Sequence, residues 1–215
     1  MCQDVRVTQV IRPFRGISAD ERRRTRRVGL LDACYTIAAA QRMMGTTVDA
    51  ICAEAGLSKR YFYESFRNRD ELFAALIDTL IAEITDAVIS SLSSTAMPLL
   101  TRVHAGIERV VAILTDDPRK AKVYVDVVGN HVHNGTVDSA EQRLAGLLVQ
   151  LVLADTDSTP AQRQRLNLVA LILVVGTARA VTAWLDGDVT LSRHDLVDEI
   201  AQMAVAAART VRPDL

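Results

Sequence analysis

Apolar residues recur along most of the chain at spacings of three and four, which is the period of an α-helix with one buried face. A long stripe of this kind begins near Asp70 and continues for about twenty residues, enough for a helix of about 30 Å. Only the stretch VYVDVV at 123–128 could pass locally for a strand. A lone strand has nothing to pair with, so we predict helix there as well.

The pattern therefore predicts an all-α protein of about nine helices. The expected helices cover residues 19–41, 47–55, 58–65, 70 to about 89, 99–114, 119–131, 137–153, 161–185 and 193 onward.

Residues that favour caps and turns separate these stripes. Ser18 precedes the first helix with Glu21 three positions later, which is the spacing of a capping box. Ser192 is placed to cap the last helix in the same way. Ser90–Met97 is rich in serine and threonine and predicts a loop, and Asn134-Gly135 predicts a turn.

The stretch Thr46–Phe66 is the most informative part of the chain. It predicts two short helices joined at Gly56, a residue that accepts the positive φ needed to end a helix and turn. Ser58 is a good N-cap for the second helix, in which Phe62 and Phe66 are four apart and can both point inward.

Lys59, Arg60 and Tyr61 then occupy the first turn of that second helix and point outward. A helix-turn-helix presents the first turn of its second helix to the DNA major groove in this way. From this stretch alone, an ordinary pair of core helices with a solvated charged turn remains the alternative.

The charge distribution supports a DNA-reading N-terminal part. The net charge is only −1, but residues 1–69 contain 13 basic and 7 acidic residues, and the other 12 basic and 19 acidic residues follow. We expect a flexible basic arm at 1–17 and then an arginine-rich start to the first helix. That basic cluster is either a solvated face or a phosphate-contacting one.

Composition also limits the cellular setting. The three cysteines, Cys2, Cys34 and Cys52, have no paired spacing, so neither a disulfide framework nor a zinc site is indicated. No N-terminal stretch resembles a signal peptide. The longest apolar run, Leu166–Ala178, is too short to span a bilayer. We expect a cytoplasmic protein without a membrane partner.

The last two predicted helices are apolar over wide faces. They carry small and aliphatic residues on more than one side, among them Gly176, Ala180 and Ala204. A helix that is apolar over more than one stripe is either central in its own subunit or covered by another subunit. We favour a homodimer formed through these two helices, with a deeply buried monomer core as the alternative.

The N-terminal motifs resemble the DNA-binding head of TetR-family transcriptional regulators. The residues that carry the resemblance are LLDAC at 30–34, TTVDAICAEAGLSKRYFYESF at 46–66 and RNRDELF at 67–73. The resemblance implies a helix-turn-helix domain at 18–69 and a helical ligand-binding and dimerisation domain at 70–215. It also implies a repressor that binds a palindromic double-stranded DNA operator as a homodimer and is released by a small-molecule effector.

The resemblance further implies which side chains contact DNA. Ser58, Lys59, Arg60 and Tyr61 would lie at the groove, Thr47 and Tyr63 would reach phosphates, and Arg69 would hold backbone at the start of the fourth helix.

The end of the first helix departs from the family pattern. Many members have phenylalanine near Ala38, glycine near Arg42 and an aromatic residue near Met43. We expect Met43 and Met44 to fill the space that these residues leave.

The effector site is less marked in the sequence. Arg179 lies among apolar residues, which favours a salt bridge or a ligand anchor, and His104, Tyr124 and Trp184 are further candidates for lining a pocket. His131 and His133 lack a third nearby ligand, so we expect no metal site and no cofactor.

No phosphate-binding glycine loop, nucleophile elbow or HExxH motif is present, so we do not expect an enzyme. The remaining alternative is a helical interaction or small-molecule-binding module without DNA binding.

Overall fold

The computed structural model describes residues 18–93, 96–129, 134–153 and 159–213. The expected basic arm at 1–17, and His131 and His133, lie outside these ranges. Within them the all-α prediction is confirmed, with nine α-helices and one turn of π-helix. The elements are α1 (Ala19–Gly45), α2 (Val48–Glu54), α3 (Lys59–Ser65), α4 (Arg69–Leu92), α5 (Leu99–Asp116), α6 (Pro118–Tyr124), η1 (Val125–Gly129), α7 (Asn134–Leu153), α8 (Pro160–Leu185) and α9 (Arg193–Val211).

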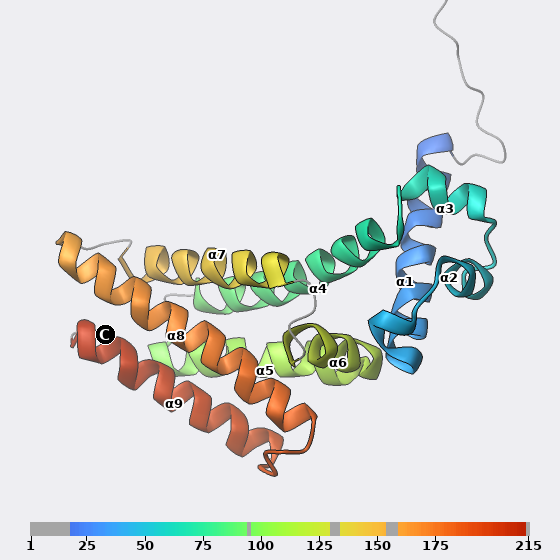
Figure 1. Ribbon diagram of the computed structural model, residues 1–215. Coiled ribbons are helices and arrows are strands. Elements are labelled where there is room, and N and C mark those ends of the chain that lie inside the picture. The colour runs from blue at the N-terminus through green and yellow to red at the C-terminus, as the bar shows by residue number, and fades with distance from the viewer. Residues whose placement is uncertain (1–17, 94–95, 130–133, 154–158, 214–215) are drawn as a thin grey trace, which may run out of the picture.

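The first three helices form a head at one end of the molecule, and α4 leads from it into the body beside α7 (Figure 1). In the body, α5 packs between α4 and α9, and α7 packs on α8. The interior is continuous from the head into the body, because the buried residues of α1, α3 and α4 belong to the same apolar cluster as those of α5 and α6.

The predicted caps at Ser18 and Ser192 are confirmed by side-chain hydrogen bonds, whereas Ser58 occupies the N-cap position of α3 without a capping bond from its side chain. The Ser18 hydroxyl accepts from the Glu21 amide at 3.0 Å, and the Ser192 hydroxyl accepts from the Asp195 amide at 3.1 Å. Thr159 and Gln162 add a complete capping box at the start of α8. These bonds satisfy amides that a helix leaves without partners in its first turn.

Two predicted loops are shorter than expected. The α4 helix continues to Leu92, so the predicted loop at 90–97 begins only after it. Asn134 and Gly135 are the first residues of α7 rather than a separate turn. Asparagine and glycine are both acceptable at a helix start, so a dipeptide typical of turns does not exclude a helix beginning there.

The end of α1 is unusual. The helix is kinked at Arg42, which has φ 61° and ψ 160° and is the one non-glycine residue with positive φ in the described ranges. This region of the φ/ψ map is normally populated by glycine, because a Cβ atom is strained there. Met43 is buried beyond the kink, as predicted, whereas Met44 is exposed and fills no gap.

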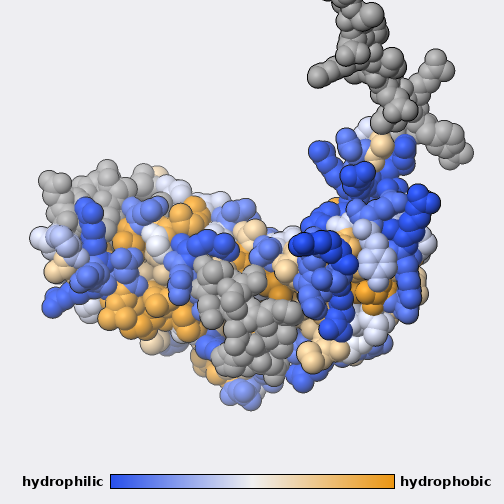
Figure 2. All heavy atoms as spheres, turned by 45° about the horizontal axis from the view of Figure 1, so that its top comes forward, coloured by the Kyte–Doolittle hydropathy of each residue, from blue (hydrophilic) through white to orange (hydrophobic). Residues whose placement is uncertain are grey.

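By length and composition alone, the α8 helix is long and apolar enough to cross a membrane. The 13-residue run Leu166–Ala178, considered in the sequence, did not indicate this. Only 17% of its most apolar 18-residue window is buried within the chain. Figure 2 shows apolar side chains gathered on the body, whereas the surface of the head is mostly hydrophilic. The single chain therefore leaves an apolar helix face uncovered.

Candidate nucleic-acid interface and effector cavity

The α3 helix presents its first turn to solvent. Gly56 has φ 63°, which ends α2 and reverses the chain toward Ser58, the N-cap of α3. Phe62 is fully buried and anchors the inner side of α3, while Lys59, Arg60 and Tyr61 are exposed. The structure thus brings together the residues predicted to face a DNA groove on one exposed helix turn.

Both cations of this turn are paired within the head. Lys59 Nζ lies 2.6 Å from Asp49 Oδ1 on α2, and the hydrogen bond to that carboxylate raises the pKa of Lys59. Arg60 Nε lies 3.1 Å from Glu64 Oε1, one turn further along α3. Exposed pairs of this kind are weak, so both cations remain available to exchange a carboxylate for a phosphate or a base.

Two arginines of α1 hold α3 in place. The Arg26 guanidinium lies 4.4 Å from the centre of the Tyr61 ring and 3.5 Å from Glu64. Arg27 lies 4.1 Å from the centre of the Phe66 ring and donates to the Ser65 carbonyl at 3.0 Å. This part of the basic cluster therefore supports α3 as well as adding positive charge.

The residues predicted to contact phosphates lie around the same surface. The Thr47 hydroxyl accepts from the Ala50 amide at 3.2 Å and so caps α2, and the Tyr63 side chain is 57% exposed. Arg69 donates to the Thr46 carbonyl at 3.2 Å and lies over Phe73. Arg69 therefore ties the start of α4 to the corner between α1 and α2.

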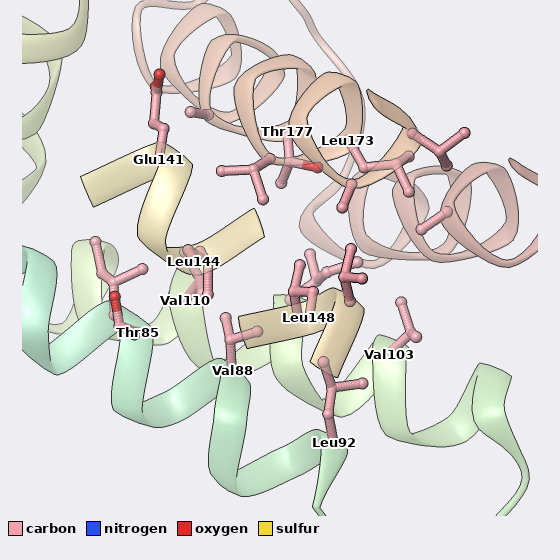
Figure 3. Close-up of a pocket in the computed structure, with 18 of the residues that line it drawn as sticks. Thr85, Val88, Leu92, Val103, Val110, Glu141, Leu144, Leu148, Leu173 and Thr177 are labelled. Atoms are coloured by element: carbon pink, nitrogen blue, oxygen red, sulfur yellow. The ribbon is translucent and has the colours of Figure 1, made fainter. Parts of the chain in front are cut away.

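The body contains a cavity of about 230 Å³ between α4, α5, α7, α8 and α9 (Figure 3). Of its 26 described lining residues, 22 are apolar, and none is lysine, arginine or histidine. The polar exceptions are Thr85, Tyr124, Glu141 and Thr177. The Glu141 carboxylate points away from the labelled apolar side chains, so the space itself is almost entirely apolar.

Only one of the four predicted ligand-binding residues lines the described cavity. Tyr124 lines the cavity, and burial raises the pKa of its hydroxyl, with a further increase from the Glu141 carboxylate. The other three do not belong to the described lining. Arg179 donates to the Val128 carbonyl at 2.7 Å, Trp184 donates to the Leu191 carbonyl at 2.9 Å, and His104 lies 2.9 Å from Asp198.

One buried carboxylate connects the body to the head. Asp126 of η1 is 7% exposed, and its Oδ2 accepts from the Met43 amide at 2.9 Å. Its Oδ1 lies 3.4 Å from Nε of Arg42, the residue with the strained backbone. We call these three residues the joint. The joint is next to the cavity in sequence, because Tyr124 and Val128 on either side of Asp126 both line it.

A second contact fixes the other end of α6 against α1. Arg119 lies 3.0 Å from Asp32 and donates to the Thr36 hydroxyl at 3.0 Å, while also pairing with Asp117 at 2.9 Å. Sequence reasoning missed both Arg119 and Asp126. The available signal was an acidic residue inside the apolar stretch VYVDVV, because a buried carboxylate requires a partner.

This arrangement defines a helix-turn-helix DNA-binding protein with a helical body. A sequence profile of the bacterial regulatory proteins of the tetR family matches residues 30–76, which include α2, α3 and the start of α4.

Solved structures share the fold over most of the chain. A tetR-family transcriptional regulator from Streptomyces coelicolor has a TM-score of 0.71 at 18% identity, covering 88% of this chain and 83% of that one. The fatty acid degradation regulator FadR from Bacillus halodurans has a TM-score of 0.68 at 16% identity, covering 83% and 94%. A TetR-like transcriptional regulator from Rhodococcus sp. RHA1 has a TM-score of 0.63 at 22% identity, covering 84% and 96%.

The profile match over residues 30–76 identifies the head as a DNA-binding domain of the tetR-family type, and the solved structures show that the body has the helical fold of such regulators. The match falls on the segment that the sequence motifs singled out. It disfavours the alternative of a helical module without DNA binding.

Ser58 gives a direct test of the exposed turn, because its side chain makes no capping hydrogen bond. We expect Ser58→Ala to change the free energy of unfolding by less than about 0.5 kcal/mol, whereas removing a bonded cap costs about 1 kcal/mol. Ser192→Ala, which removes a bonded cap, is the matched control. Chemical denaturation measures both, and an equal loss in the two variants would contradict the geometry.

Proposed function

We propose that the protein is a cytoplasmic repressor that binds a palindromic operator as a homodimer and is released by an apolar effector. The observation that carries this proposal is the cationic first turn of α3, exposed on a head whose Phe62 and Phe66 are buried. The free, buried thiols of Cys34 and Cys52 suit a reducing compartment. Residues 18–69 would be the reading domain and 70–215 the effector and dimerisation domain.

In this proposal the contacts with DNA divide by chemistry. Arg60 and Lys59 read base edges in the major groove, because arginine binds guanine with two hydrogen bonds and lysine binds it less rigidly. Ser58 and Tyr61 flank them. Thr47, Tyr63 and Arg69 position the head on the phosphates, which sets register and contributes no sequence preference.

The dimer would form through α8 and α9. Leu168 and Ile172 of α8 and Met203 of α9 are each about 60% or more exposed in the single chain. An apolar face of this kind is costly in water and is normally covered by another chain. A second copy of the chain, related to the first by a two-fold axis, covers this face. The same two-fold symmetry is present in a palindromic operator.

The effector would be a neutral molecule with an extended hydrocarbon part. The cavity offers dispersion contacts and apolar burial but no lysine, arginine or histidine in its described lining to pair with a carboxylate. The structurally similar FadR from Bacillus halodurans is a fatty acid degradation regulator. An esterified acyl chain or a hydrocarbon therefore fits this chain better than a free fatty acid does.

Release would follow from movement of α6 and η1. Occupation of the cavity presses on Tyr124 and Val128, which flank Asp126, and so shifts the joint against the end of α1. The two heads of a dimer can bind half-sites in successive major grooves only when the heads themselves are about 34–36 Å apart. The effector acts only as far as it binds the released arrangement more tightly than the DNA-binding one.

We expect Arg60→Ala and Tyr63→Phe to affect DNA binding differently. Arg60→Ala should weaken the free energy of operator binding by about 1–3 kcal/mol and relax the base preference at one operator position. Tyr63→Phe removes one hydroxyl and keeps the ring against Phe62, so it should weaken all sequences alike. Selection of bound genomic fragments gives the operator, and titration of matched duplexes measures both effects. Wild-type binding by both variants would overturn the assignments.

Asp126→Ala should uncouple the head from the body. It leaves the buried Met43 amide without its acceptor, at a cost of about 1–3 kcal/mol. We expect binding to the full operator to weaken about tenfold, while binding to a single half-site stays unchanged, because base contacts are untouched. Asp126→Asn keeps an acceptor and is the matched control. Equal losses on both duplexes would show that Asp126 does not set the spacing of the heads.

Ile172→Glu should break the proposed dimer, because it places a charge in the centre of the uncovered α8 face. We expect sedimentation velocity to show a shift from dimer to monomer and the operator affinity to fall with it. Met44→Glu is the control, since Met44 is even more exposed than Ile172 but lies on the head. A variant that remains dimeric would place the interface elsewhere.

A further inference from the structure

Two of the four histidines of the chain converge on one carboxylate outside the DNA surface and the cavity. His104 comes from α5, and His194 and Asp198 lie one turn apart on α9. His104 Nε2 is 2.9 Å from Asp198 Oδ1, and His194 Nε2 is 3.3 Å from Asp198 Oδ2. The three side chains therefore direct ligand atoms toward a common point between two helices.

We propose that His104, His194 and Asp198 form a binding site for a divalent transition metal of the zinc class. One ligand atom from each residue lies within 4.8 Å of the others. Zinc binds imidazole nitrogen and carboxylate oxygen at about 2.0–2.2 Å, so ligands around a tetrahedral ion are about 3.3 Å apart. Small rotations of partly exposed side chains bring the three atoms to that separation.

The charge and chemistry of the cluster suit such an ion. Two neutral imidazoles and one carboxylate give a mixed nitrogen and oxygen set with a single negative charge, and water completes the coordination. The neighbouring cation, Arg193, lies 2.6 Å from Glu108 and is offset by that carboxylate. Without metal, both histidine side chains lie against the Asp198 carboxylate.

The bound ion would hold two walls of the cavity together. His104 follows Val103, a lining residue of α5, and α9 contributes Ala204, Val205 and Ala208 to the same lining. The ion would also fix the first turns of α9, one of the two helices of the proposed dimer face. Metal binding is thus expected to stabilise the folded body, because the unfolded chain does not assemble the three ligands.

The test is a titration of the full-length protein, free of any histidine tag, with Zn²⁺ by calorimetry and with Co²⁺ by visible absorption. We expect one ion per chain and an increase in melting temperature on adding Zn²⁺. His194→Ala and Asp198→Asn should each weaken binding at least about tenfold and abolish the thermal shift. His194 is the most exposed of the three, so its replacement leaves the core intact.

His131→Ala/His133→Ala is the matched control, because it removes the other two histidines and leaves the cluster whole. Wild-type affinity in this double variant supports the assignment. Loss of binding only in the control, or a cobalt–thiolate absorption band, would place the ion on His131 and His133 or on cysteine. Absence of saturable binding to the wild-type protein would make the cluster an ion pair only. Each of these last three outcomes overturns the proposal.

Discussion

A carboxylate removed from water joins the body to the head. Asp126 accepts a hydrogen bond from the last part of α1 and lies beside Arg42, whose backbone is in a region that favours glycine. A buried carboxylate without these partners would be strongly unfavourable. The contact is therefore maintained only while η1 and the end of α1 keep their relative position, which makes the joint sensitive to small movements of either element.

That sensitivity gives the apolar cavity a physical connection to the surface of α3. Tyr124 and Val128 belong to the cavity wall, while Asp126 between them faces the head. At its other end, α6 is fixed to α1 through Arg119 and to α4 through Lys120 and Glu83. A side chain displaced in the cavity is thus separated from the head by one short helix with ionic contacts at both ends.

Much of the head was predictable because its signals are local. The turn at Gly56, the N-cap position of Ser58 and the inward pair Phe62 and Phe66 depend on residues close in sequence, where helix period and capping are informative. The same rules located α8 and α9. They failed at Asn134 and Gly135, where turn-forming residues begin a helix, and they did not indicate that α1 continues past a kink at Arg42.

The sequence by itself determined the all-α class, the helix-turn-helix and the outward-facing cations of α3, because each follows from spacing within a few turns of helix. Only the tertiary structure decided that Asp126 meets Met43, that Tyr124 lines the cavity while Arg179 binds the Val128 carbonyl, and that His104 approaches Asp198. These contacts join residues far apart in the chain. Their formation depends on how whole helices pack, which no local pattern of polar and apolar residues records.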